Sequence, residues 1–76
     1  MHIEFGSGAY EAFDRALSRL TGLIVKVQPG MAGEPFGASF NGEVVNNHCF
    51  VPVSNAGEPT GEQARVITDI YSIHVY

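Results

Sequence analysis

The most regular pattern in the chain lies between residues 8 and 21, where apolar side chains recur every three or four residues. This spacing places them on one face of an α-helix; they are Tyr10, Phe13, Leu17 and Leu20. Ser7, before the run, is a residue type that caps helix N-termini, and Gly22, after it, is one that ends helices. The pattern predicts an amphipathic helix over residues 8–21.

After residue 22 the apolar positions change to the alternation and the β-branched composition that are typical of short strands. The dipeptide Pro29-Gly30 is expected to end the first of these strands, and residues 29–35 to form a loop. The pattern predicts strands over residues 23–28, 36–45, 48–53 and 64–76.

Two stretches fit more than one structure. Residues 2–5 alternate in polarity, which fits a short strand or a frayed terminal arm. Asn41-Gly42 is a frequent hairpin dipeptide, but it also fits a bulge inside one strand that reaches Val45. We favour the bulge, because it leaves two strands of comparable length with the turn at Asn46-Asn47.

The final segment changes its alternation part-way along. Residues 64 and 66 have one parity, whereas the last strand has its apolar residues at the opposite parity, namely Tyr71, Ile73 and Val75. A kink or a single 3₁₀ turn near residues 68–71 would join the two. A helix followed by four or five short strands with one sharp bend predicts a mainly β fold, a small bent antiparallel barrel formed by one domain over residues 1–76.

The composition adds a constraint on assembly. The 76-residue chain is 45% hydrophobic and 16% charged, which is typical of a folded protein rather than a disordered one. A domain of this size has a small core, and its one cysteine, Cys49, excludes an internal disulfide. We therefore expect partner subunits to supplement the core, in a homo-oligomer.

The charge disfavours nucleic acid as the main partner. Eight acidic and four basic side chains give a net charge of −4, and no two cations are neighbours in the sequence, whereas a phosphate-tracking surface needs clustered Lys and Arg. The N-terminus has no basic region followed by an apolar core, and no apolar run approaches the roughly 20 residues of a membrane span. We expect a cytoplasmic protein with no membrane contact, and the lone cysteine agrees with a reducing compartment.

The last strand carries a polar set that is a candidate binding surface. Ser72, His74 and Tyr76 share one face of this strand, opposite its apolar positions. If the apolar side fills the core, the polar side lies on an exposed edge or in a subunit contact. His74 and Tyr76 would there bind a base, a ring or a protein partner, or would simply form an interface between copies.

The residues that bind metals in other proteins do not converge in this sequence. His48 and Cys49 are neighbours on one predicted strand, so their side chains point to opposite faces. The sequence has no CxxC or HxxxH spacing, and zinc needs three or four convergent ligands. We expect no metal and no other cofactor, and we find no nucleophile–base or acid–base pair that would indicate an enzyme.

The segment VITDIYSIHV, residues 66–75, resembles the closing strands of Sm-like small β-barrels. The leading helix and the segments GLIVKV, FNGEVV and HCFVPV resemble the helix-plus-five-strand order of that family, with Gly42 at the glycine of its second strand. The resemblance implies a ring-shaped homo-oligomer that binds RNA. It puts Asn46, Asn47 and His48 roughly at the family's base-binding segment.

A second resemblance is to the plasmid-borne type II dihydrofolate reductases, and it rests on the segments ASFNGEVVNNHC and DIY. It implies a homotetramer of small barrels with a central pore for folate and NADPH, lined here by Lys26, Ile70 and Tyr71. Asp69 stands where this family has glutamine. A carboxylate in the pore would repel two anionic ligands, which favours binding over reductase activity.

These observations favour a small non-enzymatic binding or adaptor module that acts as a homo-oligomer through an exposed strand or a central pore. The alternatives are an oligomeric pore enzyme that resembles type II dihydrofolate reductase and an Sm-like RNA-binding ring. The expected ligand is a protein or a small molecule. The candidate binding residues are Ser72, His74, Tyr76, Asn46, Asn47, His48 and Tyr71.

Overall fold

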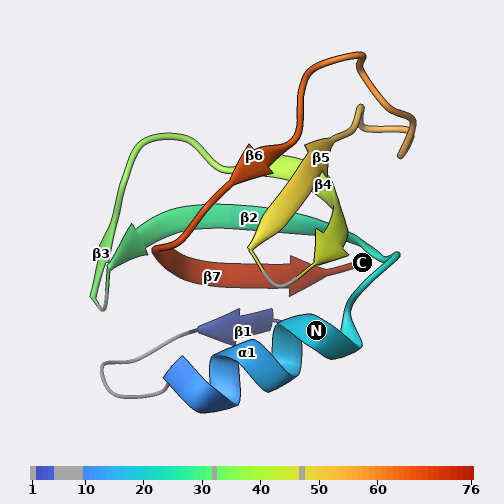
Figure 1. The fold of residues 1–76 in the computed structure, drawn as a ribbon. Helices are drawn as coiled ribbons and strands as arrows, with labels where there is room; N and C mark the ends of the chain where they lie inside the picture. The colour runs from blue at the N-terminus through green and yellow to red at the C-terminus, as the bar shows by residue number, and fades with distance from the viewer. Residues whose placement is uncertain (1, 5–9, 32, 47) are drawn as a thin grey trace.

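The computed structural model describes residues 2–4, 10–31, 33–46 and 48–76. All the strands within this part of the chain join one antiparallel sheet with the order β1-β7-β2-β4-β5-β6, and β3 lies beside β2 (Figure 1). The protein is therefore mainly β. Its elements in chain order are β1 (His2–Glu4), α1 (Tyr10–Arg19), β2 (Ile24–Met31), β3 (Glu34–Pro35), β4 (Phe40–Asn46), β5 (Cys49–Pro52), β6 (Arg65–Val66) and β7 (Ile70–Val75).

The core lies between α1 and the inner face of the sheet, which is the face turned toward α1. Side chains of β2 alternate between the two faces, with Val25 and Val27 buried on the inner one. The inner-face residues of four strands and the end of the helical segment form one apolar cluster, whose burial supplies the main stabilisation. Its members are Leu17, Leu20, Val25, Val27, Val44, Phe50, Ile70 and Ile73.

The helix lies within the predicted range of residues 8–21. Leu17 and Leu20, from the C-terminal half of the predicted apolar stripe, are both buried. The turn after α1 is fixed to β4, since the Gly22 amide donates to the Val44 carbonyl at 2.7 Å and the Val44 amide donates to Leu23 at 3.0 Å. The predicted cap Ser7, residues 8–9 and the side chains of Tyr10 and Phe13 lie outside the described part of the structure.

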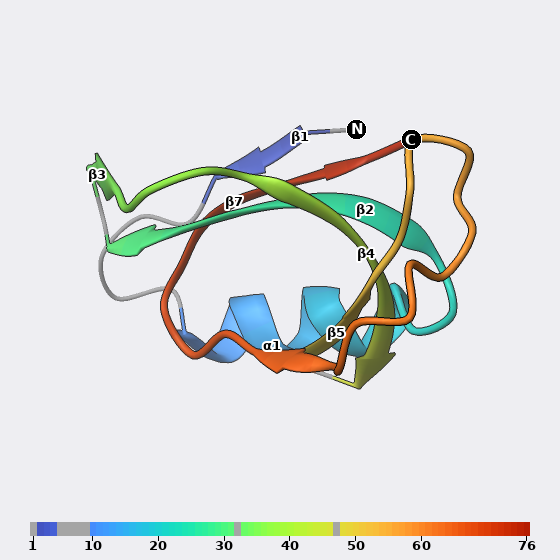
Figure 2. The ribbon, with the colours of Figure 1, turned by 90° about the horizontal axis from the view of Figure 1, so that it is seen from above.

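The sheet curls strongly, but within the described residues it does not close into the expected barrel. The strand order ends at β1 on one side and at β6 on the other, and these two edges do not pair with each other. Figure 2 shows the sheet bent around the interior and α1 lying across its open side. A closed barrel needs continuous pairing around its circumference. The edge strands have only three and two residues, and the helix covers the interior instead.

The predicted strand over residues 23–28 ends too early. β2 continues through Pro29 to Met31, and Pro29 lies at a register shift in the pairing with β7. Because proline has no N–H to donate, a break in the ladder accommodates it inside a strand. Beyond this point β2 pairs with β3, so the segment predicted as the loop 29–35 contains a short two-stranded ribbon.

The strand predicted over residues 36–45 begins later, at Phe40, and ends at Asn46. Asn41 and Gly42 pair regularly with β2, so they form neither a hairpin turn nor a bulge. The register shift of β4 lies instead at Val45, between Val44 and Asn46. Gly42 serves close packing, because a Cβ atom there would come within 3.2 Å of the Phe50 Cβ.

Two other predicted segments fall near their expected places. β5 lies inside the range 48–53, and of the two structures that fit residues 2–5, His2–Glu4 is a strand that pairs with β7. The last predicted strand is divided as expected by a bend between Val66 and Ile70.

A bulge in β7 changes the face on which Tyr71 lies. Gln28 pairs with Ser72 and Pro29 pairs with Ile70, so Tyr71 is an extra residue of β7 without a partner in β2. The bulge turns Ile70 into the core, where its side chain is 6% exposed. Simple alternation would place Tyr71 in the core beside Ile73, and because of the bulge Tyr71 lies on the opposite face of the sheet.

Substitution of valine by alanine tests the assignment of the core. Val27→Ala removes two methyl groups from a side chain that is 0% exposed, and we expect it to lower the free energy of unfolding by about 2 kcal/mol. Val66→Ala removes the same atoms from an edge residue that is 69% exposed, and we expect a change of less than about 0.5 kcal/mol. Urea denaturation measures both, and equal losses would contradict the burial described here.

Candidate functional site

The outer face of the sheet, which is turned away from α1, carries polar side chains in rows that cross several strands. His74 of β7 pairs with His2 of β1 on one side and with Lys26 of β2 on the other. One row further along, Ser72 pairs with Glu4 and Gln28 in the same way. Since residues directly opposite each other in an antiparallel sheet point to the same side, the register alone brings these groups together.

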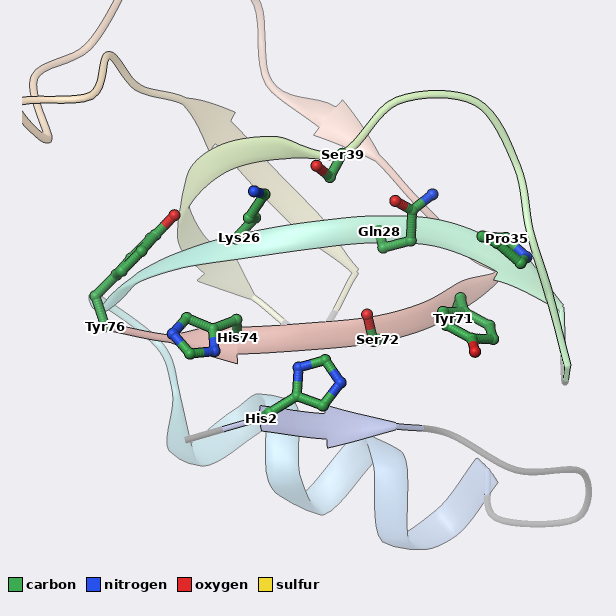
Figure 3. Close-up of a pocket in the computed structure, with 9 residues that line it drawn as sticks. All are labelled: His2, Lys26, Gln28, Pro35, Ser39, Tyr71, Ser72, His74 and Tyr76. Carbon is green, nitrogen blue, oxygen red and sulfur yellow. The ribbon is translucent and has the colours of Figure 1, made fainter.

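These rows border an open depression of about 600 Å³ on the outer face, here called the outer hollow. Figure 3 shows its side chains on β1, β7 and β2, with α1 behind the sheet. The volume falls in the range of small-molecule sites. The residues that line the outer hollow are His2, Lys26, Gln28, Pro35, Ser39, Tyr71, Ser72, His74 and Tyr76.

Aromatic rings stand in series at the Tyr76 end of the outer hollow. The ring centroids of His2 and His74 are 6.2 Å apart, and those of His74 and Tyr76 are 5.3 Å apart with the planes at 77°. The Tyr76 hydroxyl donates a hydrogen bond of 2.6 Å to Asn41 Oδ1. This bond ties the last residue to β4 and holds the phenol ring beside the imidazole of His74.

The opposite end of the outer hollow is fixed by Gln28. Its Nε2 lies 3.1 Å from the Pro29 carbonyl oxygen, 3.3 Å from that of Phe36 and 3.2 Å from that of Gly37. Through the contacts with Phe36 and Gly37, the side-chain amide of Gln28 holds the segment after β3 against β2. Gln28 therefore shapes the rim, and its side-chain N–H groups are already engaged by the protein itself.

Four of the predicted site residues meet in the outer hollow, namely Ser72, His74, Tyr76 and Tyr71. Two others lie elsewhere: Asn46 is exposed at the end of β4, and the imidazole of His48 donates from Nδ1 to the Ile67 carbonyl at 3.0 Å. Asn47 lies outside the described residues.

The three residues that the reductase resemblance assigned to a pore are separated by the sheet. Lys26 and Tyr71 line the outer hollow, whereas Ile70 belongs to the core on the inner face.

Sequence reasoning missed the contributions of His2 and Gln28 to this site. The alternation of β2 places Lys26 and Gln28 on one face, and this signal was available in the sequence. No local pattern indicates that β7 lies between β1 and β2, because this order depends on pairing between opposite ends of the chain.

Comparison with known proteins gave no match: no family model, no curated protein and no solved structure is significantly similar to this chain. Across the described residues, no group of three or more His, Cys, Asp or Glu side chains is arranged to hold a metal ion. Within the same part of the chain, no helix has the length and apolar character needed to cross a membrane.

The backbone of β2 approaches Tyr71 closely at Gly30, and substitution of Gly30 tests this contact. A Cβ atom on Gly30 would lie 2.4 Å from the Glu34 carbonyl oxygen and 2.9 Å from the Tyr71 Cβ. We expect Gly30→Ala to destabilise the protein by about 1–3 kcal/mol and to shift the Tyr71 ring resonances in an NMR spectrum. Gly33→Ala is the control, because Gly33 also has a positive φ but no atom lies within 4 Å of its Cβ position. Unchanged Tyr71 resonances in Gly30→Ala would contradict the contact.

The hydrogen bond at the chain end gives a second test of the site. Tyr76→Phe keeps the ring but removes the donor to Asn41, and we expect a loss of less than about 1 kcal/mol because the pair is exposed. The side-chain amide resonances of Asn41 should move at the same time. Tyr71→Phe removes an equivalent hydroxyl from the other end of the outer hollow and should leave those resonances in place. A shift of equal size in both variants would contradict the assignment.

Proposed function

We propose that this protein is a non-enzymatic binding module that holds its ligand in the outer hollow and acts as a homo-oligomer. The observation that carries the proposal is the convergence of Ser72, His74, Tyr76 and Tyr71, four predicted binding residues, on one depression of ligand size. A set of side chains predicted from the sequence for binding thus lines a concave surface rather than a flat one.

The groups around the outer hollow favour binding over catalysis. They comprise an ammonium group, two imidazoles, a carboxamide, two phenols and two serine hydroxyls, and the described lining includes no Asp or Glu side chain. No two of these lining side chains are hydrogen-bonded to each other, as a nucleophile and its base would be. The rings of His2, His74 and Tyr76 lie next to one another as tilted or edge-on pairs, so they offer a ligand a row of aromatic edges and faces.

The edges of the sheet support the oligomeric part of the proposal. β1 and β6 each leave one side without a strand partner among the described residues, and exposed strand edges pair readily with another chain. Val66 on β6 is largely exposed. Association would also raise the stability of a protein of this size more than that of a larger one, since its own core is small.

An oligomeric pore enzyme is a second candidate, and one observation favours it: Lys26 and Tyr71 line the same depression. Loss of NADPH absorbance on addition of dihydrofolate would support this candidate over the binding module. Its absence with both compounds in excess would exclude it.

Native mass spectrometry of the freshly purified protein tests the binding module. We expect an assembly whose mass is a multiple of the 8.2 kDa chain plus the mass of a ligand. The double variant His74→Ala/Tyr76→Ser should lose the extra mass and keep the assembly. Asn46→Ala, a predicted site residue outside the outer hollow, is the matched control and should keep both. A bare monomer, or extra mass that survives in the double variant, would contradict the proposal.

A further inference from the structure

Nitrogen-bearing side chains cross the outer hollow in one row. His2, His74 and Lys26 come from three adjacent strands and are joined by the registers of β1 and β2 with β7. Side chains directly opposite each other in such a ladder have Cβ atoms about 5 Å apart. The three groups therefore fall within the span of one small ligand.

The charge of Lys26 is not compensated within the protein. Among the described residues, no carboxylate lies within ion-pair distance of its ammonium group, and its side chain lines the outer hollow. The nearest acidic position in these rows, Glu4, is engaged by His2 at 3.3 Å. An anion in the hollow would thus meet a positive group that has no competing partner.

A hydroxyl group next to this row points to the same kind of ligand. Ser72 lines the outer hollow, and the residue is 7% exposed. Figure 3 shows this hydroxyl on the side of β7 that carries the outer hollow, between His74 and Tyr71. Its O–H group can donate a hydrogen bond to an acceptor atom of a ligand in the outer hollow.

From these three observations we infer that the outer hollow binds an organic anion that carries an aromatic ring. The inference rests on the proposed function, because it takes the outer hollow as the ligand site. Lys26, His74 and the Ser72 hydroxyl hold the anionic oxygens, and the imidazole of His2, whose Nε2 is engaged by Glu4, borders the ligand at the β1 side. The rings of His74 and Tyr76 receive the aromatic part, in the edge-to-face geometry that they already adopt with each other.

The test uses two probes that differ in charge and share a phenyl ring and a sulfonyl group. Benzenesulfonate is a monoanion at pH 7, and methyl phenyl sulfone is uncharged. Amide chemical shifts of the isotope-labelled full chain report where each probe binds and how tightly. We expect benzenesulfonate to shift amides of β1, β7 and β2 and to bind about fivefold more tightly than methyl phenyl sulfone, because only benzenesulfonate carries a charge that Lys26 attracts.

Matched variants test whether the row of nitrogen groups is responsible for the tighter binding of benzenesulfonate. Lys26→Gln should weaken benzenesulfonate binding about fivefold, since it removes one unit charge a few ångströms from the anion. Ser72→Ala should weaken it by a smaller factor of about three, the effect of one hydrogen bond. Arg19→Gln makes the same change of charge at the end of α1, on the other side of the sheet. It should leave the affinity for both probes unchanged.

The outcomes separate this inference from the proposed function. Equal affinity for the two probes, or an equal effect of Lys26→Gln and Arg19→Gln, overturns the anionic ligand while the binding module stands. Absence of any shift around the outer hollow with either probe also overturns the anionic ligand. The proposed function itself is decided by the ligand mass and its loss in the His74/Tyr76 variant.

Discussion

The register of β7 between β1 and β2 is the constraint on which the site depends. Its pairing with both neighbours puts His74 between His2 and Lys26, and Ser72 between Glu4 and Gln28. The bulge at Tyr71 then lets one short strand serve two purposes. Ile70 reaches the core on one face, and Tyr71 reaches the outer hollow on the other. Without the extra residue, alternation would place Ile70 on the outer face and Tyr71 on the inner face.

The curl of the sheet and the position of α1 follow from the small number of apolar residues. The inner face of β2, β4, β5 and β7 is concave, so Val27, Phe50 and Ile73 converge on one centre. Leu17 and Leu20 fill the side that the sheet leaves open. A flat sheet of this length would expose the same side chains, because one short helix covers little area. Curvature therefore compensates for the small size of the chain.

Local pattern was sufficient to predict part of the site and part of the fold. The alternation of the last strand put Ser72, His74 and Tyr76 on one face, and all three line the outer hollow. Alternation alone does not give the face of Tyr71, since the bulge there depends on the pairing with β2 and cannot be seen in the sequence of β7 itself. The order β1-β7-β2 could not be predicted from local pattern, because it is set by pairing between the two ends of the chain.

The grouping of Asn46 and His48 with the last strand came from resemblance rather than pattern. Asn46 lies at the end of β4, and His48 is engaged by Ile67 near β6, remote in the strand order from β1. The three residues that a resemblance assigned to a pore are likewise on different faces, since Lys26 and Tyr71 lie on the outer face and Ile70 on the inner one. A resemblance carried by hydrophobic spacing gives the order of strands along the chain, but the face of each side chain depends on register, which spacing alone does not determine.

The outer face has two parts of different character, and this bears on how binding and assembly relate to each other. The β1–β7–β2 part is polar and contains the outer hollow, whereas alternation along β5 and β6 puts Cys49, Val51 and Val66 on the outer face of the other part. Apolar side chains at a sheet edge suit a contact between copies, and polar side chains around a depression suit a ligand. In the proposed module the two contacts thus use different strands of one curved sheet. The two parts are nevertheless one sheet, because β2 and β4 pair with each other between them.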